Sequence, residues 1–432
     1  MPIDWNTVPD AHDAGEELLE LMRALFPIPR SLTGDGVRQT LEVLGREIPL
    51  EVVETPSGTQ VYDWTVPREW KLRGAWIEGP DGRRVVDVAD SPLHVLGYSI
   101  PVDAVVGLEE LRGHIFTHAD DPELIPYRTS YWKEQWGFCM SRRQLESLEP
   151  GHYHAVVDAT LEDGSLTSGE VNLRGATNAE FLLTTHVCHP ALANDNLSGV
   201  VLLWVLARTL AEQDLTHTFR LLWSPGTLGP LCWLDRNRDT LDRVSHGLVV
   251  SCVGDPGPLR YKRSRRGDAP IDRASSYVLG REPASIVSEW QPTGGDERQF
   301  CSPGFDLPVG TLSRTPHGHF REYHSSADDL TRVTADALGS AFTAALAIID
   351  LIETNASYRN LSPYGEPQLG KRGLYQSVPD GTNPELAYLW LLSLSDGNCD
   401  LLAIAERSGL PFETIRGAAE TLERHELLER IG

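Results

Sequence analysis

Apolar runs that end in polar residues alternate with helical segments between residues 179 and 257, and this alternation constrains the fold more than any other feature. AEFLLTTH (179–186), TFRLLWSP (218–225) and HGLVVSCV (246–253) are typical of buried strands, and LSGVVLLWVLARTLAEQ (197–213) is typical of a buried helix. Strands alternating with helices indicate an α/β domain with a mainly parallel sheet. Ligands collect at the carboxyl ends of such strands, so the polar residues there are the first candidates for a functional site.

The pattern of apolar runs and turn residues differs on both sides of this region. Short strand-like runs separated by turn signals, such as the GPDGRR hairpin, indicate a small β-rich module. A helix near 335–354 closes the α/β domain, and a Pro- and Gly-rich stretch leads to a tail of short helices. The expected domains are an α/β domain at 1–52 and 116–375, an inserted β module at 53–115, and a C-terminal domain at 380–432.

Charge and cysteine content exclude several functions and locations. The 432 residues carry a formal net charge of -24, which argues against nucleic-acid binding because phosphates require a basic face. The six cysteines are scattered without a CxxC motif, so we expect a reduced, cytoplasmic protein. No apolar run approaches about 18 uninterrupted residues, so we expect no membrane span.

The sharpest polar cluster follows the strand at 179–186. His186, His189 and Asp195 lie within ten residues, between that strand and the start of a helix. Neutral imidazole and carboxylate are suitable zinc ligands, and a carboxylate can bridge two ions. The alternative is that Asp195 or Asn196 only caps the helix. A cap needs no histidines, so the metal interpretation is favoured, with Cys188 as a packing residue.

Three further clusters give weaker signals. Asp255 ends a strand, although Asp in a Gly/Pro turn is usually structural. Glu322 and His324 follow a loop whose histidines, His317 and His319, are compatible with simple solvation. The Gly-Gly-Asp-Glu-Arg segment at 294–298 is, from spacing alone, better explained as a surface ion-pair cluster.

The order of these motifs resembles that of the M28 zinc aminopeptidases, and most closely a bacterial subgroup with a DUF4910-type domain. The matching segments include DWTVPREW (63–70), the CHP motif at 188–190, DERQFCSPGFDLPVG (296–310) and EYHSSADDL (322–330). The resemblance spans nearly the whole chain. It implies a phosphorylase/hydrolase-like α/β fold, which is a mixed sheet with helices on both faces, together with an inserted β module and a C-terminal winged helix.

The resemblance also implies a metal site for one or two Zn²⁺ ions. Its ligands by motif position are His186, Asp195, Asp255 and His324. M28 enzymes usually have an Asp where this chain has Cys188, and His189 is the candidate to take part instead. His186, Asp195 and Asp255 would hold one zinc, whereas the position formed by Asp195 and His324 lacks a ligand.

One departure from the family pattern affects catalysis. M28 enzymes carry a Glu pair after the next strand, one of them the general base, and this chain has Gly226 where the subgroup has a Glu. Hydrolysis at a zinc site needs a group that accepts a proton. Asp296, Glu297 and Glu322 are the carboxylates in matching segments that are candidates to replace it.

The C-terminal tail contains short helical segments and a turn that are spaced as in a winged helix. From residue 386 it carries four Arg, no Lys and eight Asp/Glu, so DNA binding is disfavoured and a packing or dimerisation module is favoured. The resemblance implies a small-molecule or short peptide-like substrate as one partner. The tail implies a second copy of the chain as another.

Three functions remain open from the sequence. The first is a zinc-dependent aminopeptidase-like enzyme that acts on an amide bond of a small amino-acid-like substrate. The second is a repurposed transferase or amide-forming enzyme in natural-product or sugar biosynthesis. The third is a non-catalytic binding or regulatory protein with residual zinc.

Overall fold

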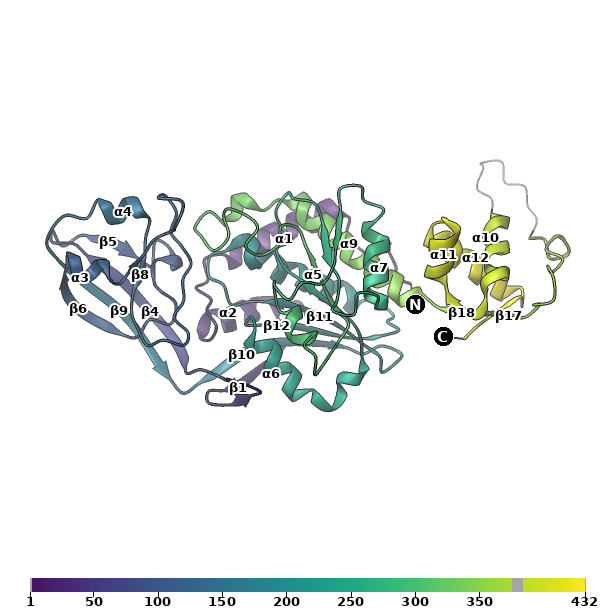
Figure 1. The fold of residues 1–432 in the computed structure, drawn as a ribbon, viewed down its shortest axis with the longest axis horizontal. Coiled ribbons are helices and arrows are strands. Elements are labelled where there is room, and N and C mark those ends of the chain that lie inside the picture. Colours follow the sequence, from purple (N-terminus) through teal and green to yellow (C-terminus); the bar gives the residue numbers. More distant parts are fainter. Residues whose placement is uncertain (1, 375–383, 432) are drawn as a thin grey trace. The chain divides into compact units, whose positions relative to one another are not determined.

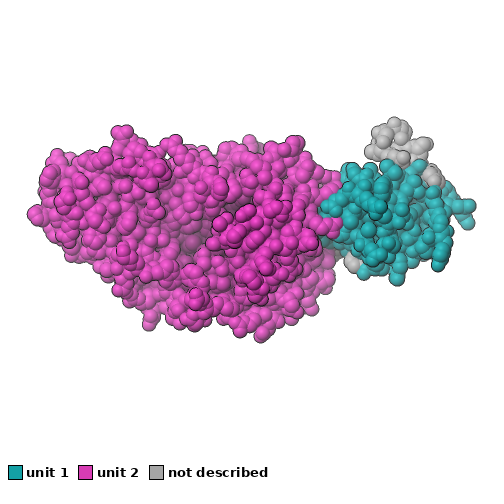
Figure 2. Space-filling model, in the orientation of Figure 1, with its two compact units in different colours: residues 1–3, 347–432 teal, residues 4–346 magenta. Residues whose placement is uncertain are grey.

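The computed structural model describes residues 2–374 and 384–431, which belong to two compact units (Figure 2). One unit comprises residues 4–346. The other comprises the first three residues and residues 347–432. The larger unit contains the α/β sheet and the β module, and the smaller contains the C-terminal helices (Figure 1).

An eight-stranded mixed sheet forms the core of the α/β part of the larger unit (Figure 1). The strands β12, β11, β13 and β16 are mutually parallel, and antiparallel strands flank them on both sides. In sheet order the strands are β1 (Glu51–Pro56), β10 (Ser165–Leu173), β12 (Thr218–Ser224), β11 (Glu180–His186), β13 (Val244–Val250), β16 (Val309–Ser313), β14 (Arg260–Lys262) and β15 (Ile286–Ser288).

Helices cover both faces of this sheet, as the neighbouring side chains of β12 show. The indole nitrogen of Trp223 donates to the carbonyl of Val200 in α5 (Ser198–Ala211) at 3.1 Å. The adjacent Leu222 belongs instead to the buried cluster that includes Trp233 of α6 (Leu228–Arg236). Successive strand residues point to opposite faces, so α5 and α6 cover opposite faces. The predicted fold class is confirmed.

Two glycines allow α1 (Ala11–Leu25) and α9 (Ala335–Thr354) to cross in close contact. A Cβ at Gly339 would lie 1.8 Å from the Ala11 carbonyl oxygen, and one at Gly15 would lie 2.0 Å from that of Ala335. The other helical segments of this unit, outside the β module, are α2 (Asp35–Leu44), η2 (Ala193–Leu197), η3 (Arg238–Arg243), α7 (Pro270–Leu279), α8 (Glu297–Phe300) and η4 (Leu330–Arg332).

The β module is built on a four-stranded antiparallel sheet in the order β5-β4-β9-β6. Because β9 pairs with both β4 and β6, the sheet extends beyond the expected limit at residue 115. Its strands are β4 (Glu69–Glu78), β5 (Arg84–Asp87), β6 (Val102–Gly107) and β9 (His152–Glu162). Smaller elements nearby in sequence are β2 (Gln60–Val61), β3 (Trp64–Thr65), η1 (Pro92–His94), α3 (Leu108–Arg112), β7 (Ile115–Phe116), β8 (Phe138–Cys139) and α4 (Arg142–Glu146).

In its described residues, the C-terminal unit combines helices with a three-stranded sheet in the order β18-β17-β19. The expected domain limits at 375 and 380 lie outside the described residues. Since β17 pairs with β18 and β19, however, this unit starts well before 380. Its elements are β17 (Ser357–Asn360), η5 (Gly370–Arg372), α10 (Pro384–Leu394), β18 (Asp396–Asp400), α11 (Leu401–Ser408), α12 (Phe412–Arg424) and β19 (Leu428–Arg430).

Helix α9 is the one helix among the described residues with the length and composition of a membrane span. Within the protein, 67% of its 18-residue apolar window is buried, which is also the pattern of a helix in a protein core.

Candidate metal centre

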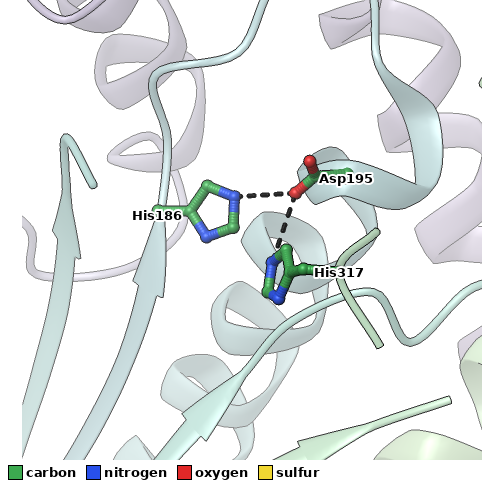
Figure 3. A group of neighbouring side chains, drawn as sticks. All are labelled: His186, Asp195 and His317. Carbon is green, nitrogen blue, oxygen red and sulfur yellow. Dashed lines mark hydrogen bonds and ion pairs between the residues drawn. The ribbon is translucent and has the colours of Figure 1, made fainter. Parts of the chain in front are cut away.

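The candidate site lies at the carboxyl ends of the parallel strands, where ligands collect in open α/β sheets. His186 is the last residue of β11, and Asp195 lies in η2, directly before α5. His317 and His324 come from the loop that follows β16. Segments far apart in the sequence therefore meet at one edge of the sheet (Figure 3).

Asp195 lies at the centre of four imidazoles. Its Oδ1 lies 2.9 Å from Nε2 of His186, 3.5 Å from Nε2 of His317 and 3.6 Å from Nδ1 of His189. Its Oδ2 lies 3.0 Å from Nε2 of His324. The residues form two groups that could each hold a metal ion and that share Asp195, one with His186 and His317 and the other with His189 and His324.

Burial and the shared carboxylate set the protonation states in this cluster. Burial alone would lower the pKa of His317, but Cys252 and Asp195 raise it well above its usual value, so without metal this imidazole carries a positive charge beside Asp195. Burial alone would raise the pKa of Asp195, but the imidazoles of His189, His186 and His317 hold it well below its usual value. Burial lowers the pKa of His186 to about 4, and it also lowers the pKa of His324. A carboxylate beside neutral imidazoles is a typical zinc ligand set.

Several buried polar atoms of the cluster make no hydrogen bond to the described residues. These atoms are Nδ1 of His189, Oδ2 of Asp195 and Nε2 of His324. The last two lie 3.0 Å apart, but without the geometry of a hydrogen bond. Buried polar groups normally have hydrogen-bond partners. The residues at this site therefore fit a divalent cation such as zinc.

Two residues that were not predicted as ligands, Asp328 and Asn196, hold the cluster in place. The carboxyl of Asp328 accepts the backbone N–H groups of Asn194 and Asp195 at 2.7 and 2.9 Å, and burial raises its pKa to about 7. The side-chain nitrogen of Asn196 lies 3.2 Å from Nδ1 of His186 and donates to the carbonyl of that residue at 3.0 Å. Such contacts orient the groups that bind a metal.

The structure does not bring Asp255 into either group, so the geometry gives no support to the prediction that it is a ligand. Its Oδ1 accepts hydrogen bonds from the Gly257 N–H and the Thr315 hydroxyl, both at 2.8 Å. Its Oδ2 accepts from Asn194 Nδ2 at 3.0 Å and from the Thr315 N–H at 3.1 Å. Four donors already occupy the carboxylate, which braces the loop after β13.

His317 takes a place in the cluster that the sequence did not predict. Its side chain is only 17% exposed, and its ring lies near that of His186, with centroids 5.5 Å apart (Figure 3). In the sequence it looks like a solvated loop residue. Its position seven residues before His324 was the one signal available, because residues of one loop can converge on one site.

Of the three candidate bases, Asp296 lies beside Gly226. A Cβ at Gly226 would be 3.8 Å from Oδ1 of Asp296 and 3.7 Å from Cβ of His186. Oδ1 of Asp296 accepts the Thr227 N–H at 2.7 Å, whereas its buried Oδ2 has no hydrogen-bond partner among the described residues. Burial raises the pKa of Asp296 to about 6. This carboxylate therefore lies where the missing Glu was expected.

The other two candidates are paired with cations. Glu297 is buried and forms an ion pair with Lys262. Oε1 of Glu322 lies 3.2 Å from the guanidinium of Arg332. Neither belongs to the two groups around Asp195. Among the predicted carboxylates, the geometry favours Asp296.

Gly226→Ala tests whether position 226 has room for a side chain. The new Cβ would meet nothing closer than 3.7 Å, so we expect a change in the free energy of unfolding of less than about 1 kcal/mol. The control is Gly229→Ala, whose Cβ would lie 2.5 Å from Cβ of Ser224, and it is expected to cost about 1–3 kcal/mol. Chemical denaturation measures both, and an equal loss in the two variants would contradict this packing.

Comparison with known proteins agrees with the two-part organisation. Residues 19–355 match the family described as a domain of unknown function, DUF4910, and residues 356–430 match a winged helix-turn-helix. A Clostridium acetobutylicum protein is 44% identical over 430 residues, 98% of each chain, and is provisionally named a polysaccharide biosynthesis protein with aminopeptidase-like domain. A crystal structure from that organism, provisionally named a peptidase, has a TM-score of 0.93 at 43% identity and covers 98% of this chain and 97% of that chain.

More distant structures share the fold. BSAP, a zinc aminopeptidase from Bacillus subtilis, is 12% identical with a TM-score of 0.58, covering 79% of this chain and 94% of its own. A peptidase M28 precursor from Shewanella amazonensis is 14% identical with a TM-score of 0.52, covering 79% and 96%. At these identities the likeness establishes the aminopeptidase-like fold alone.

Proposed function

The chain belongs to the DUF4910 family, and from this membership and the geometry of its site we propose that it is a zinc-dependent hydrolase. Its substrate is a small amino-acid-like or short peptide-like molecule, in which it cleaves an amide bond. The observation that carries the proposal is the convergence of two imidazole pairs on one buried carboxylate, Asp195. The aminopeptidase-like fold supports the choice of an amide bond.

Five side chains would hold the metal. Asp195 would be shared, His186 and His317 would serve one position, and His189 and His324 the other. When bound, zinc polarises a carbonyl and makes water a better nucleophile at neutral pH. Tyr127 packs edge-on against the rings of His189 and His324, with centroids 5.1 Å apart in each case, and keeps these two imidazoles in position.

Asp296 would act as the proton acceptor. It is buried beside Gly226, and its Oδ2 has no hydrogen-bond partner among the described residues, so one oxygen is available for a proton. A pKa raised to about 6 suits a group that takes up and releases a proton near neutral pH. The hydrogen bond from the Thr227 N–H to Oδ1 fixes the orientation of the carboxyl group.

Metal analysis combined with an amide-cleavage assay tests the proposal. We expect the purified protein to contain a divalent metal and to release free amine from at least one member of a panel of aminoacyl amides. Chelation is expected to abolish this release, and added zinc to restore it. A protein without metal would contradict the proposal, as would a zinc-loaded protein inactive on the whole panel.

A second candidate function is a step in polysaccharide biosynthesis. The step would transfer an acyl group to a sugar or form an amide on one. The name of the Clostridium acetobutylicum relative, which matches over 98% of both chains, favours it. Incubating the zinc-loaded protein with an amino sugar and an acyl donor distinguishes the two. Mass spectrometry would detect an amide product only if the second candidate is correct.

The C-terminal unit fits a packing or oligomerisation role better than DNA binding. In α12, Arg416 is paired with Asp350 at 3.3 Å, which leaves one fewer basic side chain for phosphates. We also propose a reducing compartment such as the cytoplasm, because six scattered cysteines without a CxxC motif are typical of one.

A further inference from the structure

We propose that Lys262 is a positioning residue for Asp296 and acts through the buried carboxylate of Glu297. The inference rests on the proposed function, in which Asp296 accepts a proton, and deepens it by identifying what holds that carboxyl group in place. Lys262 itself touches neither substrate nor metal. It holds the short segment that carries Asp296 against a strand of the central sheet.

The contacts of the Lys262 ammonium all lead to one segment of the chain. Its Nζ forms an ion pair with Oε1 of Glu297 and donates to the carbonyls of Thr293 at 2.6 Å and Gln291 at 3.4 Å. It also lies 5.1 Å from the centre of the Trp290 ring, within the range of a cation–π contact. One ammonium group therefore joins four neighbouring residues.

This segment has no regular backbone structure of its own. Residues 290–295 form no helix or strand, and within the described part of the chain no backbone-to-backbone hydrogen bond holds them. Lys262, by contrast, is the last residue of β14, which pairs with β15 and β16 in the central sheet. A side chain anchored on a sheet strand therefore fixes an irregular segment, which is how functional groups on loops are held in place.

The position of the ion pair matters for Asp296 because Asp296 and Glu297 are consecutive residues. Glu297 is fully buried as the first residue of α8. On its other side Asp296 accepts the N–H of Thr227 at 2.7 Å. Thr227 has a φ of +66°, which is rare for a β-branched residue and requires support from its surroundings. Asp296 is therefore held between the ion pair and the Thr227 N–H.

A salt bridge that only stabilises the fold is the simpler explanation. The side chains of Lys262 and Glu297 are 15% and 0% exposed, so both ions lose much of their hydration. The loss of hydration offsets much of the attraction between buried ions, so such a pair is a weak source of stability. It also does not explain why the other hydrogen bonds of the ammonium go to carbonyls of the same segment. The two explanations differ in what happens to Asp296 in the folded protein.

Three variants separate the two explanations. Lys262→Met/Glu297→Gln removes the ammonium without leaving an unpaired buried charge, which would be strongly destabilising. Glu297→Gln alone weakens the contact, because a neutral oxygen accepts a weaker hydrogen bond than a carboxylate. The control is Lys71→Met, since Lys71 also lies on a strand, β4, and pairs with a buried carboxylate, Glu69, at 3.5 Å.

Hydrogen exchange of the full-length protein tests the positioning without any substrate. The Thr227 amide reports on Asp296, because its N–H donates to that carboxylate. In the double variant we expect this amide to exchange about two- to tenfold faster, the effect of losing about one ordinary hydrogen bond. Glu297→Gln should show a smaller increase, and Lys71→Met none. Unchanged exchange in β11 and β13 would show that the double variant remains folded.

Steady-state kinetics tests the consequence for the reaction. The double variant is expected to lower kcat by about 10²-fold, as a misplacement of about 1 Å can, while KM and metal content stay unchanged. Added to Asp296→Asn, the same two substitutions should lower kcat no further, because the group they position is already absent. Lys71→Met should keep the wild-type rate.

The outcomes separate this inference from the proposed function. Wild-type exchange at Thr227 in the double variant would overturn the positioning role, whether or not the protein cleaves amides. An equal loss of kcat with and without the Asp296 carboxylate would overturn it as well. A zinc-loaded protein inactive on every amide would overturn the proposed function, and the exchange measurement would still decide the role of Lys262. Should the double variant fail to fold, unchanged Thr227 exchange in Glu297→Gln would contradict the inference.

Discussion

Asp195→Asn is expected to remove zinc from both positions of the site. Asp195 is common to both groups of ligands, and the substitution replaces its negative charge with a neutral amide. We expect zinc affinity to fall by at least about 100-fold, the upper end of the losses seen for residues that only orient ligands. Elemental analysis after dialysis against a weak chelator measures the loss, and amide hydrolysis is expected to disappear with the metal.

Asp255→Asn is the matched control, because Asp255 is also buried and also follows a strand of the sheet. Its carboxylate accepts four hydrogen bonds, so the new amide group would face donors and destabilise the fold by about 1–3 kcal/mol. We expect its metal content to stay at the wild-type level. Equal metal loss in both variants would contradict the placement of Asp195 as the shared ligand.

Single histidine variants distinguish the two metal positions and leave the carboxylate of Asp195 unchanged. His324→Ala is expected to lose the metal held with His189, and His186→Ala the metal held with His317. Each variant is expected to retain part of the metal content. Complete loss in either would mean that the two positions do not bind independently.

The larger elements of the fold were predictable because local signals specify them. The strand ending at His186 is buried along its whole length and contains the apolar run FLL, and the helix following Asp195 is mostly apolar, so both show in the sequence. The pairing of β9 with β4 and β6 was not predictable, because it joins segments about 50 to 80 residues apart. The sequence of residues 152–162 predicts a strand but does not indicate which strands it pairs with.

The candidate site was partly predictable for the same reason. His186, His189 and Asp195 are close in sequence, so the strand-to-helix junction was enough to place them together. His317 enters the cluster only through the path of a long loop. The strand-end position of Asp255 was visible in the sequence, but the donors that occupy its oxygens were not.

The glycine at 226 illustrates what a family pattern can and cannot reveal. The pattern shows that a carboxylate is missing, but it does not show which residue lies in the space. Asp296 is 70 positions further along the chain, and it reaches Gly226 because the loop before α8 and the end of β12 lie at the same edge of the sheet. Its backbone contact with Thr227 fixes this approach.

Asp296→Asn is expected to reduce kcat by about 10²- to 10⁴-fold while the metal content stays unchanged. That range is typical for removal of a group that accepts a proton in the transition state. Asp296 lies outside both groups of metal ligands, and an amide keeps its shape and its contact with the Thr227 N–H. Steady-state kinetics with elemental analysis of the same samples measures both quantities.

The pH profile and a control variant make this prediction specific to Asp296. Only the ionised carboxylate accepts a proton, so kcat/KM should fall as the pH drops through the pKa of Asp296. Burial raises this pKa to about 6, and the positive charge of bound metal lowers it, so the acidic limb should lie at or below about pH 6. Asp296→Asn should remove this limb, whereas Glu322→Gln, which loses only a contact with Arg332, should keep both the rate and the limb. A wild-type rate in Asp296→Asn would show that another group accepts the proton, and a lost limb in Glu322→Gln would identify Glu322 as that group.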